Sequence, residues 1–167
     1  MMAFRHLLLI DRLLLMLIVT GFTLPLASSA SSQQSTPTCA EAKASAQRRL
    51  AGIRNLTVKI ETLDFSTAYP DHPEGRSDNY MVSMQGKAVS SVMNSPLLMK
   101  TIASDVLNAC DTIGMVTFGQ ANSGWFQRVG MFADGMIDFF KCAEDVGINP
   151  GRGSEGRLRW GLNYCSI

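Results

Sequence analysis

The four cysteines of this 167-residue chain are the side chains whose chemistry depends most on their surroundings. No two of them are separated by the C-x-x-C spacing that is typical of metal sites and catalytic thiols. In an oxidising compartment an even number of cysteines predicts two disulfide bonds, although four cysteines allow three pairings. We favour the pairs Cys39–Cys110 and Cys142–Cys165. The second pair would hold the C-terminal tail against the strand that precedes it.

Histidine is scarce, and its scarcity excludes several catalytic classes. The chain contains only His6 and His72, so neither a multi-histidine zinc site nor an H-E-x-x-H metalloprotease motif is present. His72 lies between two prolines in a polar stretch, which predicts an exposed loop residue. The alternative is a general base that is oriented by Asp71 or another carboxylate and activates a serine. No G-x-S-x-G elbow supports that alternative.

The carboxylates are scattered over predicted loops and one predicted hairpin. A glycosidase needs two carboxyl groups that face each other across a cleft, and facing cannot be read from a sequence. Asp71, Glu74 and Asp78 fall in one loop but lack the D-x-D-x-D-G pattern of a calcium loop. We therefore expect solvated acids, and we predict neither a metal nor another cofactor.

Five aromatic residues cluster on one predicted hairpin: Trp125, Phe126, Phe132, Phe139 and Phe140. Bulky apolar groups occupy both parities of the first strand, which favours a central strand that is buried on both faces. The alternative is an exposed recognition patch. In that case Trp125 and Phe126 are the candidate partner-binding residues.

A glycine-rich stretch follows this hairpin and contains three arginines. Residues 151–156 match G-x-G-x-x-G, but no strand-to-helix unit surrounds them, so we do not expect a dinucleotide site. Arg152, Arg157 and Arg159 are candidates for contact with an anionic partner such as a phosphate or an acidic polysaccharide. A merely solvated loop is the simpler interpretation. The possible partner is thus a protein or a polysaccharide.

The first thirty residues have the pattern of a signal peptide. Arg5 and Arg12 precede an apolar run, and the small residues Ser28 and Ala30 offer a cleavage site, which predicts a mature chain that starts at Ser31. The apolar stretch is shorter than the roughly 20 residues that a spanning helix needs. We therefore predict a secreted or periplasmic protein without a stable membrane anchor; retention of the segment as an anchor is the alternative.

Removal of residues 1–30 changes the charge balance of the chain. The whole sequence has 15 basic and 14 acidic side chains, and the predicted signal peptide takes two arginines and one aspartate with it. The remainder is formally neutral, which argues against broad electrostatic attraction to nucleic acid. Its length fits one domain, predicted over residues 39–167, after a flexible polar leader over 31–38.

The elements that position these residues follow from hydrophobic periodicity. Helical spacing of apolar residues predicts helices over 40–54 and 96–110, the second starting at Pro96 with Ser95 as a possible cap. Alternation predicts strands over 56–65, 80–86, 113–118, 125–132 and 136–142, with an exposed loop over 66–79 and at most a helical turn in 87–94. Together they predict an α+β fold: an antiparallel sheet of about five short strands, including a C-terminal meander, covered on one face by two helices and stabilised by disulfides.

Four short motifs resemble segments of small exported proteins of cyanobacteria. They are Asn94-Ser95-Pro96, Val116-Thr117-Phe118-Gly119, the run from Gly135 to Cys142, and Trp160-Gly161 with Cys165. The resemblance covers roughly the last 75 residues and implies an exported α+β domain. No activity comes with it. We therefore expect an exported, disulfide-bonded domain that acts by non-catalytic binding or as a structural component, with a small extracytoplasmic hydrolase, using His72 or a carboxylate pair, as the alternative.

Overall fold

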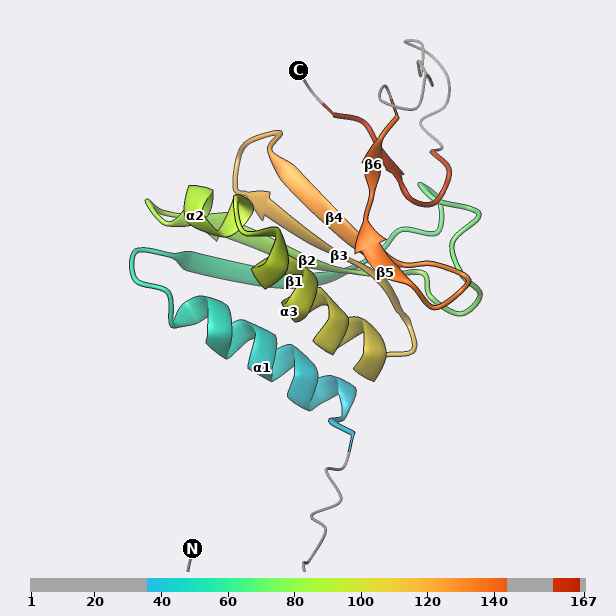
Figure 1. Cartoon of the computed structure of the whole chain (residues 1–167), viewed down its shortest axis with the longest axis horizontal. Coiled ribbons are helices and arrows are strands. Elements are labelled where there is room, and N and C mark those ends of the chain that lie inside the picture. Colours follow the sequence, from blue (N-terminus) through green and yellow to red (C-terminus); the bar gives the residue numbers. More distant parts are fainter. Residues whose placement is uncertain (1–35, 144–157, 166–167) are drawn as a thin grey trace, which may run out of the picture. The chain divides into compact units, whose positions relative to one another are not determined.

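A computed structural model describes residues 36–143 and 158–165 (Figure 1). The residues predicted to form the signal peptide and most of the leader lie outside the described residues, as do Arg152 and Arg157. The described elements are, in order, α1 (Cys39–Ala51), β1 (Thr57–Asp64), β2 (Asp78–Gln85), α2 (Val89–Met93), α3 (Pro96–Ala109), β3 (Ile113–Gln120), β4 (Phe126–Met131), β5 (Ile137–Phe139), β6 (Lys141–Cys142) and β7 (Leu162–Asn163).

Five strands form one sheet in the order β1-β2-β3-β4-β5, and β6 pairs with β7 in a separate two-stranded ribbon. The predicted α+β class, the five-stranded sheet and the antiparallel meander β3-β4-β5 are confirmed. The sheet is mixed, however, since β2 and β3 run parallel. The reason is that α2 and α3 return the chain to the starting end of β2 before β3 begins.

The main core lies between the helices and one face of the sheet. Helices α1 and α3 lie together on this face (Figure 1), and Tyr80, Val82 and Met84 alternate towards it from β2. Strand β3 contributes Val116 and Phe118 to the same core, and its residues are buried from Ile113 to Gly119. Because β3 is buried on both faces, a second layer must cover the face that the helices leave open.

Two helix starts differ in how their free backbone groups are satisfied. Thr38 and Glu41 form a capping box at α1, in which each side chain accepts a hydrogen bond from the other residue's backbone N–H. The hydrogen bonds that the Thr38 backbone and hydroxyl donate to the Glu41 carboxyl lower its pKa. At α3, Pro96 occupies the first turn as predicted, but the Ser95 side chain makes no capping hydrogen bond, so the predicted hydroxyl cap is wrong.

The segment between β1 and β2 departs from the prediction of an exposed loop. Tyr69 is only 3% exposed, and its hydroxyl donates to the Leu162 carbonyl at 2.9 Å. Two prolines and several charges are typical of a solvated segment. Its few apolar residues, Phe65, Ala68 and Tyr69, nevertheless pack under the C-terminal ribbon. The loop therefore belongs to the second layer over the sheet.

Each disulfide fastens a terminal segment of the domain to a neighbouring element. Cys39 at the start of α1 bonds to Cys110 at the end of α3, and Cys142 on β6 bonds to Cys165 beyond β7. This is the pairing that we favour from the sequence. Two disulfides fit a chain that folds in an oxidising compartment. In residues 36–143 and 158–165, no helix has both the length and the apolar character that crossing a membrane requires.

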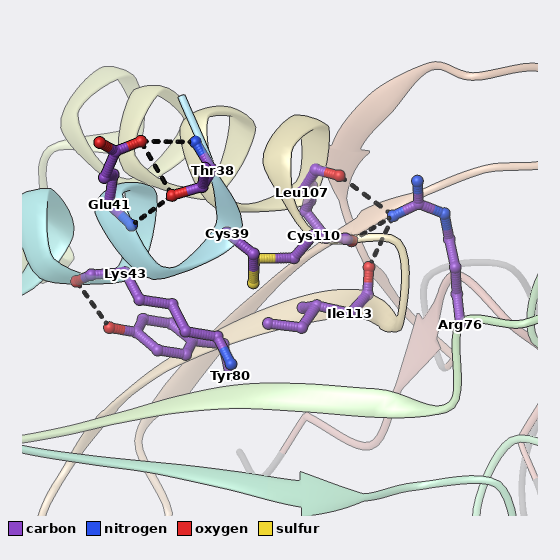
Figure 2. The surroundings of a disulfide bond; sticks show 9 residues. All are labelled: Thr38, Cys39, Glu41, Lys43, Arg76, Tyr80, Leu107, Cys110 and Ile113. Atoms are coloured by element: carbon purple, nitrogen blue, oxygen red, sulfur yellow. Dashed lines mark hydrogen bonds between the residues drawn. A yellow bond between two sulfur atoms is a disulfide. The ribbon is translucent and has the colours of Figure 1, made fainter. Parts of the chain in front are cut away.

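Arg76 closes the carboxyl end of α3 from the β1–β2 loop, as Figure 2 shows. Its Nη1 donates to the carbonyl oxygens of Leu107, Cys110 and Ile113 at 3.0, 3.1 and 2.8 Å. The last carbonyls of a helix have no partner within the helix and carry partial negative charge, so a guanidinium is well placed there. Arg76 thus joins the loop, the helix end and the start of β3.

Substitution Arg76→Ala is expected to lower the free energy of unfolding by about 2 kcal/mol, because three buried or half-buried carbonyls lose a charged donor. The fall in the urea midpoint at constant denaturant slope measures it. Arg49→Ala is the matched control. Its salt bridge to Asp105 is largely exposed and contributes roughly 0.5 kcal/mol. Equal losses for the two variants would contradict the role given to Arg76.

Candidate functional site

A second apolar cluster covers the sheet face that points away from the helices. Its buried members are Tyr69, Met115, Phe140, Ala143 and Leu158, with Trp160, Phe132 and Phe65 packed against them. Met115 reaches this cluster because it alternates with Val116, which points to the helices. The Trp160 indole donates to the Met131 carbonyl at 3.0 Å. The C-terminal tail packs here through Trp160, and the bond between Cys142 and Cys165 holds the tail to the preceding strand, as the favoured pairing predicts.

Arg128 on β4 is a half-buried cation beneath this layer. Its Nη1 donates to the Tyr69 hydroxyl at 3.0 Å and to the Asn163 side-chain carbonyl at 2.8 Å. Its guanidinium carbon lies 4.4 Å from the centre of the Phe126 ring, which is close enough for a cation–π interaction. Nε is buried without a hydrogen-bond partner in the described part of the chain. Arg128 thus joins the sheet to the loop and to the ribbon.

Burial shifts the pKa values of both Arg128 and Tyr69. Removal of Arg128 from water lowers the pKa of its guanidinium, and the neighbouring Tyr69 opposes that change only partly. Burial also raises the pKa of Tyr69, against the attraction of Arg128 for a phenolate. The raised pKa of Tyr69 favours a neutral phenol, which accepts a hydrogen bond from the Arg128 guanidinium. The pair therefore connects β4 to the β1–β2 loop through a hydrogen bond that is largely shielded from water.

A hollow of about 610 Å³ opens beside this connection, at the edge of the ribbon. The described residues that line it are Ser123, Gly124, Trp125, Phe126, Gln127, Cys142, Tyr164 and Cys165. They come from the β3–β4 turn, from β4 and from the two ends of a disulfide, so the hollow depends on the second disulfide bond for one wall. Trp125 is 39% exposed, which is unusual for a large aromatic side chain.

Polar groups in the hollow differ in how far they are already engaged. The Ser123 hydroxyl donates to the Gln120 carbonyl and accepts from the Trp125 backbone N–H, each at 3.1 Å. Among the described residues, neither the Gln127 amide nor the Tyr164 hydroxyl forms a hydrogen bond. None of the eight described lining residues carries a formally charged side chain. The described lining of the hollow thus offers aromatic faces and neutral polar groups.

The predicted partner residues are only partly brought together. Trp125 and Phe126 line the hollow, whereas Arg159 is exposed in the short segment before β7 and is not among the lining residues. The other two arginines, Arg152 and Arg157, lie outside the described residues. Phe139 and Phe140 pack in the two cores, as the interpretation of a buried hairpin predicts.

His72 does not form a catalytic constellation with the described residues. Its Nδ1 lies 2.9 Å from the Pro73 carbonyl, and its ring contacts the Trp160 ring at 6.4 Å between centres. Asp71 accepts a hydrogen bond from the Trp160 backbone N–H instead of orienting the histidine. Hydrogen bonds from Ser66 are the main cause of the lowered pKa of Asp64, and the electrostatic contribution of His72 is smaller.

Two acids of the hairpin between β4 and β5 also make local contacts. Asp138 pairs with Lys100 of α3 at 3.0 Å, which lowers the pKa of Asp138, and Asp134 accepts from the Met136 backbone N–H in the hairpin turn. Across residues 36–143 and 158–165, no three histidine, cysteine, aspartate or glutamate side chains are grouped so that they could hold a metal ion. Glu144 and Asp145 lie outside the described residues.

No protein-family model, curated protein or solved structure matches the chain. The geometry of its own residues therefore carries the functional interpretation. Sequence reasoning singles out Trp125 and Phe126 but misses Tyr164, Gln127 and Arg128. A signal for Arg128 exists, since a charged residue at an inward parity of an apolar strand must find buried acceptors.

Proposed function

We propose that this chain is an exported, non-catalytic binding domain, secreted or periplasmic, whose ligand is an uncharged saccharide segment held in the hollow beside Trp125. The single observation that carries the proposal is an exposed tryptophan in a hollow of about 610 Å³ whose described lining combines aromatic with uncharged polar side chains. The two disulfides and the resemblance to small exported cyanobacterial proteins support export. The signal-peptide pattern of residues 1–30 supports it as well.

The shape and chemistry of the hollow favour a sugar over a charged ligand. A sugar ring has an apolar face of C–H groups that can lie on an aromatic ring, and hydroxyls around its edge that need neutral donors and acceptors. Trp125 and Tyr164 offer the aromatic surface, while the Gln127 amide offers both a donor and an acceptor. Aromatic walls with a few convergent polar groups are the usual composition of small-ligand sites.

Substitution Trp125→Ala is expected to weaken binding of neutral oligosaccharides about tenfold or more, because it removes the largest exposed aromatic surface of the hollow. A glycan array of neutral and charged oligosaccharides would find the ligand. Isothermal titration with the selected sugar would then compare the variants.

Leu97→Ala is the matched control, since Leu97 is 78% exposed and lies outside the hollow. Its affinity should equal that of the unmodified protein. Equal binding by Trp125→Ala, or selective binding of peptides or anionic glycans, would overturn the proposal.

A further inference from the structure

Strand β1 forms one edge of the five-stranded sheet. It pairs with β2 along its whole length, and no strand in the described part of the chain pairs with its other side. The Phe65 N–H donates to the Ser77 carbonyl, so odd-numbered residues of this segment direct their backbone groups towards β2. The even-numbered residues Val58, Ile60 and Thr62 therefore direct their N–H and C=O groups outward.

The outer edge is long enough to take another strand. At eight residues, β1 is longer than a typical strand, and its later half is exposed. An unpaired edge of this kind is a template for pairing with a further chain, and many proteins block it with a bulge, a proline or repelling charges. β1 contains no proline, and its register with β2 is continuous from Thr57 to Asp64.

The charges on β1 favour a second copy of β1 as the partner strand, in one particular register. Lys59 and Glu61 flank Ile60 on the face away from the helices, where they form an exposed salt bridge at 2.8 Å. If a second copy of β1 pairs antiparallel with Ile60 on the two-fold axis, each Lys59 lies directly opposite Glu61 of the other copy. A two-fold axis through Lys59 or Glu61 would instead oppose like charges, which destabilises a pair of strands.

Hydrogen-bond geometry agrees with the same register. With the axis at Ile60, Val58 faces Thr62 of the second copy and Ile60 faces itself. All three positions direct their backbone groups outward, so each facing pair can exchange both N–H···O bonds. The half-exposed Val58 and Ile60 side chains would then gain apolar neighbours on the helix side.

We propose that the domain forms a symmetric dimer through antiparallel pairing of two β1 strands, with Ile60 on the two-fold axis. The two five-stranded sheets become one continuous sheet. This self-pairing is independent of the saccharide-binding proposal, because β1 contributes no residue to the hollow.

Sedimentation velocity of the full exported protein, up to millimolar concentration, tests the proposal. We expect a monomer–dimer equilibrium for the unmodified chain. Thr62→Pro should leave only monomer, because it removes an outward N–H that makes no bond within the sheet. Thr62→Ala keeps that N–H and should still dimerise. Circular dichroism and thermal unfolding of each variant verify that the monomer is folded.

A charge-swap series tests the register separately. Lys59→Glu should weaken dimerisation about tenfold, because two attractive contacts become repulsive across the axis. The double variant Lys59→Glu/Glu61→Lys should restore it, while Lys87→Glu, which changes net charge equally outside β1, should leave it unchanged. A strictly monomeric unmodified protein, an unaffected Thr62→Pro dimer, or no rescue by the double swap would each overturn the proposed pairing.

Discussion

The variant Cys39→Ala/Cys110→Ala is expected to lose about 4 kcal/mol of unfolding free energy. The bond joins residues 71 positions apart, and in the chain-entropy model a loop of that length contributes about 4 kcal/mol. It also fastens the start of α1, which otherwise contacts the domain through α3, β1 and the hydrogen bond from Tyr80 to the Lys43 carbonyl (Figure 2). Urea denaturation followed by far-ultraviolet circular dichroism measures the loss.

The second disulfide provides the comparison for this experiment. Cys142 and Cys165 are 23 positions apart, so Cys142→Ala/Cys165→Ala should lose about 3 kcal/mol. Its removal should loosen mainly the β6–β7 ribbon and the hollow, because Cys142 belongs to β6 and both cysteines line the hollow. An unchanged urea midpoint in the Cys39/Cys110 variant would contradict the role of the longer loop.

Phe140→Ala is expected to cost about 4 kcal/mol, which is typical of a large buried aromatic side chain. Phe140 is 5% exposed and meets the rings of Tyr69 and Trp160 edge-on, at 5.6 and 5.0 Å between centres.

Phe140 also fills the space above Gly130, where an added Cβ would come within 2.3 Å of its ring. Gly130→Ala alone should therefore destabilise the fold by about 2 kcal/mol through overpacking.

A double-mutant cycle separates this steric effect from other causes. In the Phe140→Ala background, Gly130→Ala should cost much less than in the unmodified protein, because the ring that it would strike is gone. Thermal and urea unfolding of the four proteins provide the coupling free energy. Additive losses would show that Gly130 is required for a reason other than the close approach of Phe140.

The individual elements are largely predictable from sequence, because their apolar periodicity is strong. Ala42, Ala46 and Leu50 recur at helical spacing and are buried in α1, and Val58 and Ile60 alternate towards the core from β1. The turn at 133–135 is marked by glycine, and Gly135 adopts a positive φ of 80°. Local chemistry determines these features, so a local pattern reveals them.

Strand direction is the part of the fold that the pattern does not contain. An alternating strand such as β2 looks the same beside a parallel or an antiparallel neighbour. The parallel pairing with β3 arises from the crossover through α2 and α3, and the short α2 gives only a weak helical signal. The second layer is equally hidden, since it assembles Tyr69, Phe140 and Trp160 from three distant segments.

The candidate site is also only partly predictable from the sequence. Trp125 and Phe126 stand out in the sequence as aromatic neighbours on a hairpin, but Tyr164 becomes part of the hollow only through the bond between Cys142 and Cys165. Arg128 is notable in the sequence as a charge within an apolar strand. Its acceptors, Tyr69 and Asn163, are 59 and 35 positions away, and only the tertiary structure reveals them.

The order of the two disulfides along the chain has a consequence for how the protein matures. Neither bond encloses a cysteine of the other, because the first cysteine is joined to the second and the third to the fourth. A chain that enters an oxidising compartment N-terminus first, and whose thiols are oxidised as they arrive, would form each native bond directly. Oxidation in chain order therefore requires no exchange of partners between the two bonds.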